Sequence, residues 1–413
     1  MRILSGKSAA AFVQRLATRS VRLDSVEPQV RTIVNAVHRG GDRALRRYAE
    51  RWDGLSPKQA LRVTPAEMRQ AWKSASPQLR DALAKSASNI RQFCEWQKPV
   101  AWTRSRDGIS LGQLVIPLES VGCYVPGGRH PLVSTLLMTV IPAQVAGVKN
   151  IRVVSPNAAQ DVLASCSMLG VREVYRSGGA QAIAALAYGT ETIARVDKIV
   201  GPGNIYVTIA KKLVSFDCAI DLIAGPTEAV VLSETGNPQF IAGDLVSQAE
   251  HDPEAISIFI TSRRGLAEAV SAEVVRIAKN NATARVSLKN RGAVLLVRSQ
   301  QQAREWANAL APEHITVSEE DVPFIQNAGS IFVGDYSPQA AGDYASGPNH
   351  VLPTSGQARF RGGLSVLDFV KLVTVQKLSQ GGLRRIASTV ECLAEVEGLR
   401  AHAESIRARY ASV

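Results

Sequence analysis

Residues 173–203 read EVYRSGGAQAIAALAYGTETIARVDKIVGPG, and this stretch decides the class of fold. It begins with a short apolar strand that ends in two glycines and continues as an alanine-rich helix. It closes with a second strand that ends in GPG. The segment IRVVSP at 151–156 predicts another strand of the same kind. Strands that alternate with helices at this pace predict a parallel sheet with helices on its faces.

The alternation of strands and helices continues to residue 365. Further strands are predicted for TEAVVLSE, AISIFITS, GAVLLVRS, HITVSEE and GSIFVG. We therefore expect two α/β sheets, one over residues 120–228 and another over 229–365. Helices are expected over the first 100 residues and again after 365. The last helices carry an apolar stripe formed by Leu393, Val396, Leu399, Ile406 and Tyr410. Such a terminal arm cannot bury its own apolar face, so it must pack on the body or on another subunit.

Composition indicates an ordinary globular protein. The 413 residues are 46% hydrophobic and 20% charged. Five scattered cysteines without a CxxC pair argue against a disulfide framework and a thiolate zinc site, and they favour a reducing compartment such as the cytoplasm. The N-terminal segment does not resemble a secretory signal. Residues 131–148 carry no charge, but Pro142 interrupts them, so we expect a buried helix rather than a membrane span.

The net charge of +12 raises the question of a nucleic-acid partner. The first 60 residues hold 12 Lys and Arg against 5 Asp and Glu, mostly at helical spacing, which is typical of a solvated helix face. No basic run of five or more residues occurs, and no aromatic residues are interleaved for base stacking. We therefore predict neither a nucleic-acid nor a membrane partner, while small anionic ligands such as dinucleotides remain compatible with the charge.

Three glycine-rich turns are candidates for phosphate binding. Two of them, SGGAQAIAAL (177–186) and VGPGNIYV (200–207), join a strand to a helix, where free backbone N–H groups attract anions. The third is YVPGGRHP (124–131). None completes GxGxxG, and Tyr206 stands where the third glycine of the second turn would lie. Each turn alone is explained by chain geometry, but three together in an α/β chain favour a dinucleotide.

Four of the six histidines follow a nearby carboxylate: His251 in QAEHD, His314 in APEH, His350 at the end of GDYASGPNH, and His402 in EGLRAH. A lone histidine is usually structural. Four histidines in acid-rich loops flanked by glycine and proline predict a shared site, because a carboxylate fixes the tautomer that a ligand or a base needs.

Gln248 and His251 are three positions apart, so on a helix ending near 250 their side chains share one face. The Glu-His pair suggests a metalloprotease, but no second histidine follows at the right distance. Nitrogen and hard oxygen donors suit zinc or a similar divalent ion. Two ligands are too few, and Asp343 and His402 are the natural completions.

Glu313 and His314 stand between a predicted helix and the strand ITV. A neutral histidine can take a proton from an alcohol, and a glutamate can activate water. The alternative is that Glu313 is an exposed acid that caps a turn.

Long motifs then identify a family resemblance. The motifs run in family order from about residue 120 to 402: VGCYVPGG, SGGAQAIAALAYGT, VGPGNIYV, IDLIAGPTEAVVL, DLVSQAEHD, APEH, AGSIFVG, GDYASGPNHVLPTSGQAR, GLSVLDFVK and EGLRAH. With GDRALRRYAERWDG near the N-terminus, the chain strongly resembles the histidinol dehydrogenase family. One departure is Thr227, which stands where many members have serine, and the hydroxyl is retained.

The resemblance implies an enzyme that oxidises L-histidinol to L-histidine in two steps through an aldehyde, with NAD and one zinc ion per subunit. The implied zinc ligands are Gln248, His251, Asp343 and His402. The implied catalytic pair is Glu313 and His314. These six residues would also contact the substrate, together with Thr227, Tyr344, His350 and Glu397. The implied NAD contacts are Tyr124, Gln181 and Asn204.

The resemblance also implies an intertwined homodimer with two incomplete Rossmann-like α/β domains and helical arms at both ends. The expected division is a helical arm over 1–24, a first domain over 25–119 plus 229–365, a second, NAD-binding domain over 120–228, and an arm over 366–413. His402 and Glu397 would then serve the partner's site. Rival functions are oxidation of another amino alcohol and a zinc amidohydrolase.

Overall fold

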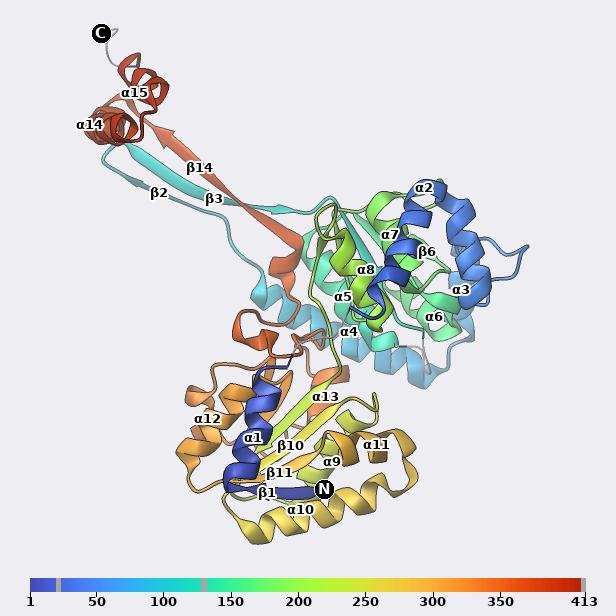
Figure 1. The fold of residues 1–413 in the computed structure, drawn as a ribbon. Helices are drawn as coiled ribbons and strands as arrows, with labels where there is room; N and C mark the ends of the chain where they lie inside the picture. The colour runs from blue at the N-terminus through green and yellow to red at the C-terminus, as the bar shows by residue number, and fades with distance from the viewer. Residues whose placement is uncertain (20–23, 128–131, 410–413) are drawn as a thin grey trace.

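The structure is a computed structural model, and it describes residues 1–19, 24–127 and 132–409 (Figure 1). Two parallel sheets form the body, and a three-stranded antiparallel sheet projects from it. Each predicted strand named above is present, so the expected α/β class with parallel sheets is confirmed. Short 3-10 turns connect several elements: Pro156–Ala158, Ala278–Asn280, Glu319–Phe324, Gln357–Arg359 and Val366–Phe369.

The larger sheet has six parallel strands in the order β1-β11-β10-β9-β12-β13. Their bounds are β1 Arg2–Ser5, β9 Glu228–Leu232, β10 Ile256–Thr261, β11 Ala293–Leu296, β12 His314–Val317 and β13 Ser330–Val333. Strands β9 and β10 are buried along their whole length, as expected for a parallel sheet covered on both faces.

Two sets of helices cover this sheet. One face packs against α1 (Gly6–Ala17) and α12 (Gln300–Leu310). The other face packs against α9 (Pro238–Ala249), α10 (Arg264–Ile277) and α11 (Ala282–Asn290). The short helix α13 (Gln339–Tyr344) contacts α9.

The smaller sheet has five parallel strands in the order β6-β5-β4-β7-β8. Their bounds are β4 Ser120–Tyr124, β5 Asn150–Val154, β6 Glu173–Tyr175, β7 Lys198–Val200 and β8 Ala219–Ile220. Helices α5 (Val133–Ala146) and α6 (Gln160–Met168) cover one face, and α7 (Gly179–Tyr188) and α8 (Ile205–Val214) cover the other.

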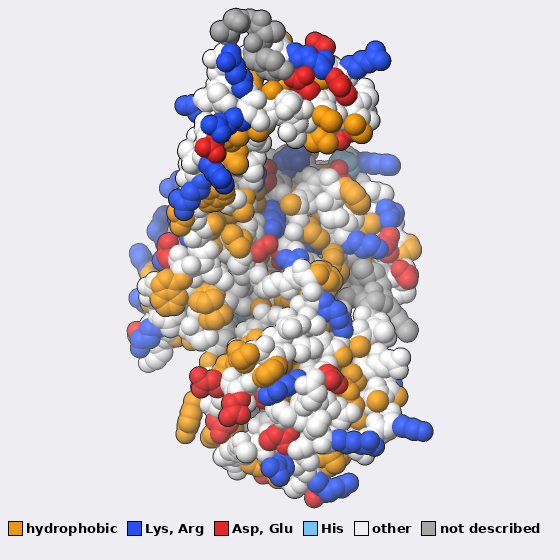
Figure 2. All heavy atoms as spheres, turned by 90° about the vertical axis from the view of Figure 1, so that its left-hand side faces the viewer, with side chains coloured by type: hydrophobic (Ala, Val, Ile, Leu, Met, Phe, Trp, Pro, Cys, Tyr) orange, Lys and Arg blue, Asp and Glu red, His pale blue; other side chains and the backbone are white. Residues whose placement is uncertain are grey.

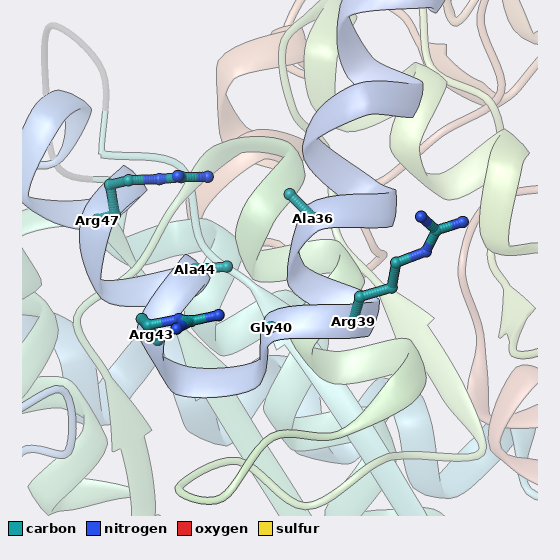
Figure 3. Close-up of a pocket in the computed structure, with 6 residues that line it drawn as sticks. All are labelled: Ala36, Arg39, Gly40, Arg43, Ala44 and Arg47. Carbon is teal, nitrogen blue, oxygen red and sulfur yellow. The ribbon is translucent and has the colours of Figure 1, made fainter.

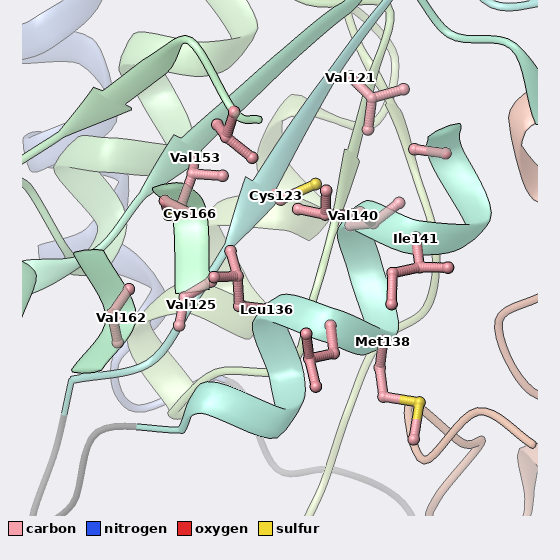
Figure 4. Close-up of a cluster of buried hydrophobic side chains, with 14 of the residues drawn as sticks. Val121, Cys123, Val125, Leu136, Met138, Val140, Ile141, Val153, Val162 and Cys166 are labelled. Carbon is pink, nitrogen blue, oxygen red and sulfur yellow. The ribbon is translucent and has the colours of Figure 1, made fainter. Parts of the chain in front are cut away.

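Helix α5 confirms the buried-helix prediction for the described part of 131–148. Eleven of its residues are buried, and Pro142 lies inside the helix. Figure 4 shows Leu136, Val140 and Ile141 of α5 in one cluster with Val121 and Cys123 of β4. Among the described residues, no helix combines the length and apolar character needed to cross a membrane.

The contacts correct the expected division of the N-terminal third. Helices α2 (Glu27–Trp52), α3 (Pro65–Ser74) and α4 (Pro77–Gln97) pack around the five-stranded sheet, although we expected 25–119 to belong with 229–365. The apolar face of α2 meets the alanine-rich α7, which offers a flat buried surface. The described part of the expected 1–24 arm, residues 2–17, is not separate either, because β1 pairs with β11 and α1 packs on α12.

The projecting arm corrects the prediction of helices alone after residue 365. Strand β14 (Val370–Leu378) pairs antiparallel with β3 (Ile109–Pro117), which pairs with β2 (Trp102–Arg106). Helices α14 (Gln380–Val396) and α15 (Arg400–Arg407) follow at the tip (Figure 1). Two sequence signals mark these strands. One is the β-branched run 373–375, and the other is Asp107-Gly108, a pair typical of a tight hairpin turn.

Candidate active site

The candidate catalytic residues gather at the amino ends of two neighbouring strands of the six-stranded sheet. His314 is the first residue of β12 and pairs with Ala229 of β9. Thr227 directly precedes β9, and Glu313 directly precedes β12. Because parallel strands start at the same edge of a sheet, the side chains of Thr227, Glu313 and His314 lie close together there. The side chains of Glu313 and His314 approach each other at this edge of the sheet.

Glu313 is a buried carboxylate held by two donors. Its Oε2 accepts hydrogen bonds from Thr227 Oγ1 at 2.7 Å and from the backbone N–H of Glu228 at 3.1 Å. Burial raises the pKa of Glu313 to about 7, although the nearby His314 and the Thr227 hydrogen bond lower it. A carboxylate with this pKa can exchange a proton at neutral pH. Glu313 is buried, which does not fit an exposed turn cap.

His314 lies between two carboxylates. Its Nδ1 is 3.7 Å from Glu313 Oε2, and its Nε2 is 3.4 Å from Asp343 Oδ1. Burial lowers the pKa of His314, but the charges of Glu313 and Asp343 outweigh this effect, and the net pKa is raised. The buried Nδ1 makes no hydrogen bond among the described residues. Such an imidazole is suited to accept a proton.

Asp343 connects His314 to the predicted metal ligands. Gln248, in the last turn of α9, donates from Nε2 to Asp343 Oδ2 at 3.0 Å. His350 lies within hydrogen-bonding distance of the Asp343 carbonyl, at 2.8 Å from Nδ1. Burial lowers the pKa of His350, and the neighbouring His251 contributes to this shift. His251 itself follows the end of α9 and is exposed.

The predicted nucleotide contacts lie at the carboxyl ends of three strands of the other sheet. Tyr124 ends β4, Gln181 is in the first turn of α7 after β6, and Asn204 caps α8 after β7. The strand order reverses between β4 and β7, which is where open α/β sheets bind ligands. The third glycine turn extends into 128–131, which lies outside the described residues.

Close internal contacts fix the geometry of these turns. Tyr124 Oη accepts a hydrogen bond from Gly179 N at 3.1 Å. Asn204 Oδ1 accepts from the N–H groups of residues 206 and 207, which leaves its amide nitrogen for a ligand. Gly201 has a φ of +115°, and a Cβ there would lie 2.2 Å from the Tyr124 carbonyl oxygen, so only glycine fits.

Comparisons with known proteins decide the family. The family model described as histidinol dehydrogenase matches residues 16–410. A histidinol dehydrogenase from Methanothermobacter thermautotrophicus is 48% identical over 402 residues, covering 94% of each chain. One from Aquifex aeolicus is 44% identical over 408 residues, covering 96% of each. The crystal structure of histidinol dehydrogenase from Elizabethkingia anophelis superposes with a TM-score of 0.94 at 34% identity, covering 100% of this chain and 98% of that one.

The chain belongs to the histidinol dehydrogenase family. The resemblance read from the motifs is therefore confirmed, and the protein is an oxidoreductase of the family that catalyses the final step of histidine biosynthesis.

The donor set of a histidinol dehydrogenase zinc site is only partly assembled in one chain. Gln248 and Asp343 are in contact, and their oxygen donors suit a divalent ion. Among the residues that the structure describes, no three His, Cys, Asp or Glu side chains lie close enough to hold a metal ion. His402 on α15 and Glu397 at the end of α14 are exposed on the projecting arm. The nitrogen and oxygen donors of the predicted ligands are of the kinds that suit a zinc ion.

Two acidic residues of the site were missed from the sequence. Asp244 lies one helical turn before Gln248 on the same face of α9 and accepts a hydrogen bond from Gln339 N at 3.3 Å. Burial raises its pKa to about 6. Glu228, the first residue of β9, forms a buried ion pair with Arg19. The i,i+4 spacing could have revealed Asp244, whereas nothing local indicates the partner of Glu228.

The hollow drawn in Figure 3 lies away from both groups of family residues. It has a volume of about 400 Å³ and sits at the bend of α2, lined by Ala36, Arg39, Gly40, Arg43, Ala44 and Arg47. Three arginines in one place account for part of the basic charge near the N-terminus.

Proposed function

We propose that this protein is a zinc-dependent histidinol dehydrogenase that converts L-histidinol to L-histidine by two successive NAD-dependent oxidations through histidinaldehyde. The observation that carries the proposal is the contact chain Glu313–His314–Asp343–Gln248 at the amino ends of β9 and β12. In a member of the histidinol dehydrogenase family, these contacts support a role for His314 as proton acceptor and for Asp343 and Gln248 as metal donors.

Gln248, His251 and Asp343 would hold the zinc ion together with His402 of a second copy of the chain. Zinc, when bound, supplies a Lewis-acidic anchor for the imidazole and amine of the substrate. A glutamine ligand is neutral, so the ion keeps a strong affinity for these nitrogens. Thr227, Tyr344, His350 and Glu397 complete the proposed substrate contacts.

In the first oxidation, His314 removes the proton of the substrate hydroxyl while the carbon-bound hydrogen leaves as hydride to NAD⁺. The neighbouring carboxylates of Glu313 and Asp343 stabilise the imidazolium that forms. The raised pKa of His314 shows that the protonated ring is favoured in this surrounding. The product of this step is the aldehyde.

In the second oxidation, Glu313 accepts a proton from the water that adds to the aldehyde. The Thr227 hydroxyl and the Glu228 N–H hold the carboxylate in place for this transfer. After His314 has released its first proton to solvent, it accepts a hydroxyl proton of the resulting hydrate while the second hydride leaves to another NAD⁺, and the product is the acid. Because burial brings the pKa of Glu313 to about 7, the residue can both accept and release the proton near neutral pH.

The five-stranded sheet and its helices would form the Rossmann-like NAD domain. Gly178 packs closely on Pro156 and Gly201 on the Tyr124 backbone, so these glycines hold the turns tightly at the start of α7 and α8, where backbone N–H groups attract anions. Tyr124, Gln181 and Asn204 are the proposed NAD contacts. The six-stranded sheet forms the second Rossmann-like domain and carries the chemistry.

The projecting arm supports an intertwined homodimer with shared active sites. Large apolar side chains are exposed along it: Trp102, Leu111, Leu114, Leu372, Val375, Leu393, Val396 and Leu399. Figure 2 shows hydrophobic side chains on the arm among basic ones. Exposed apolar surface of this extent marks an interface. Five cysteines outside any disulfide agree with a cytoplasmic enzyme.

An absorbance assay of NADH formation tests the proposal. The purified protein should release two NADH per histidinol, and a chelator should abolish the signal until zinc is restored. His38→Gln is a matched control, because His38 stacks on Tyr188 away from the site and its loss should leave the stoichiometry unchanged. NADH formed only with another amino alcohol would replace the substrate. Chelator-sensitive amide hydrolysis without NADH would replace the reaction class.

A further inference from the structure

The carboxylate of Asp53 is bonded to the glycine turn that begins α7. Asp53 directly follows α2 and is only 6% exposed. Its Oδ2 accepts two hydrogen bonds, from the backbone N–H of Gly178 at 2.9 Å and from Gln181 Nε2 at 3.1 Å. Both donors belong to the turn that carries a proposed NAD contact. A residue 128 positions away in sequence from Gln181 therefore sets the geometry of that turn.

A second buried aspartate shows what is unusual about Asp53. Asp221 holds the other glycine turn by accepting a hydrogen bond from Gly201 N at 2.7 Å, and it forms an ion pair with the buried Lys211. Asp53 has no such cation among the described residues. A buried carboxylate without a counter-charge is costly, so its hydrogen bonds to the turn are its main compensation. Burial accordingly raises the pKa of Asp53.

The bond to Asp53 decides which end of the Gln181 carboxamide is free. Because Nε2 donates to Asp53, the oxygen Oε1 is left, and it accepts no hydrogen bond among the described residues. Gly179 lies beside this oxygen with a φ of +58°, and a Cβ there would lie 2.8 Å from Oε1. Tyr124 Oη holds the N–H of Gly179. These contacts fix the turn at the start of α7 and leave Gln181 Oε1 as an acceptor.

We propose that Asp53 is a positioning residue that fixes the carboxamide of Gln181 so that its oxygen, and not its nitrogen, faces the nucleotide cofactor. The inference rests on the proposed use of NAD by the five-stranded domain. An acceptor at this place suits a hydroxyl or amide donor of the dinucleotide. Asp53 itself touches neither cofactor nor substrate, and it acts through Gln181.

Asp53→Ala tests the orientation, because it removes the one oxygen that accepts from both Gly178 N and Gln181 Nε2. The Gln181 carboxamide is then free to turn over and offer its nitrogen to the cofactor. NAD⁺ affinity measured by calorimetry on the full-length protein should fall about tenfold, which is the loss of one good hydrogen bond. The KM for NAD⁺ should rise by a similar factor, while the KM for histidinol stays within twofold.

Two further variants separate positioning from general damage. Asp53→Asn keeps one side-chain oxygen, which can accept both hydrogen bonds in the place of Oδ2, and it should bind NAD⁺ within about twofold of wild type. Gln181→Ala removes the carboxamide, and adding Asp53→Ala to it should cost no further affinity, a coupling that two unrelated defects do not produce. Asn204→Ala with Gln181→Ala is the control pair, and its two losses of affinity should add.

The outcomes distinguish this inference from the proposed function. The inference is overturned if wild-type protein binds NAD⁺ and Asp53→Ala binds it within twofold. It is also overturned if both KM values change together, or if Asp53→Ala weakens binding further in the Gln181→Ala background. Wild-type protein that binds no NAD⁺ would overturn the proposed function itself. Circular dichroism and the thermal midpoint of each variant identify a folding defect, and the affinity retained by Asp53→Asn decides in that case.

Discussion

The two parallel sheets of this protein have the same strand order and present their candidate residues at opposite ends. In the five-stranded sheet the order is β6-β5-β4-β7-β8, and in the six-stranded sheet the same pattern recurs as β11-β10-β9-β12-β13, with β1 added at the edge. The nucleotide turns follow the carboxyl ends of β4, β6 and β7, whereas Thr227, Glu313 and His314 stand at the amino ends of β9 and β12. Strand order alone therefore does not locate a site.

The two regions also differ in completeness. All three proposed NAD contacts lie within one chain around neighbouring turns. The proposed zinc and substrate set includes His402 and Glu397, which lie on the arm. We infer that the first region can bind its ligand in a monomer, while the second requires a partner.

The largest effect is expected when two variants are mixed. Gln248→Ala and His402→Ala should each reduce activity below about 1% of wild type, since each removes a proposed metal ligand. Unfolding and refolding the two together should restore about a quarter of wild-type activity, because half of the dimers then carry one intact site out of two. No recovery despite proven exchange of subunits would show that each arm closes its own site.

His314→Asn should lower kcat for both oxidations by roughly 10²–10⁴-fold, the usual contribution of a general base. Its effect should be confined to the six-stranded region. Calorimetry should therefore find NAD⁺ affinity within about twofold of wild type. A parallel loss of NAD⁺ binding would show that the two regions are not independent.

Thr227→Val should shift the pH dependence of the aldehyde oxidation. The Thr227 hydroxyl stabilises the ionised form of Glu313 and so lowers its pKa. Removing this hydrogen bond raises the pKa further, and because the base must be ionised to act, the acid limb near pH 7 should move about one unit to higher pH. Rates with histidinal as substrate, measured from pH 5.5 to 9.5, check this. Thr227→Ser keeps the hydroxyl and should leave the limb unmoved.

Asn204→Ala is expected to have the smallest effect. It removes the cap of α8, which costs about 1 kcal/mol of stability, together with one proposed NAD contact. Asn204→Asp keeps the capping oxygen but replaces the amide donor with a negatively charged carboxylate, which repels the phosphates of the cofactor. Thermal unfolding should separate the two variants, since only Asn204→Ala should lower the midpoint, while calorimetry should find weaker NAD⁺ binding in both. Unchanged NAD⁺ affinity in Asn204→Asp would limit Asn204 to a cap.

The sequence allowed the body of the fold to be predicted because parallel strands are short apolar runs bounded by glycine turns. TEAVVLSE and AISIFITS are such runs, and both became fully buried strands. Strand β14 was not predicted, because both faces of the arm sheet stay partly exposed and VKLVTVQKL therefore lacks the apolar pattern of a buried strand. The packing of α2 on the five-stranded sheet was not predicted either, because the amphipathic pattern of a helix does not indicate which sheet the helix covers.

The site residues that could be predicted from the sequence are those that lie close together in it. Glu313 and His314 are adjacent, and Gln248 precedes His251 by three positions, so spacing indicated them. Asp53 joins its turn across 125 positions in sequence from Gly178, and no periodicity reports a contact of that kind.

The position of β1 has a consequence for the order in which the chain folds. The five-stranded sheet and the helices that cover it come from one stretch, residues 27–220, whereas the six-stranded sheet and its helices need residues 2–17 and 228–333 together. During synthesis this inner unit, residues 27–220, is complete before Ala293, the pairing partner of Arg2, has been made. Once folded, the inner unit brings Arg19 within hydrogen-bonding distance of Glu228, at 2.6 Å. Folding of the inner unit thereby shortens the effective loop between β1 and β11, so we expect co-translational folding of this unit to lower the entropic cost of adding β1 to the sheet.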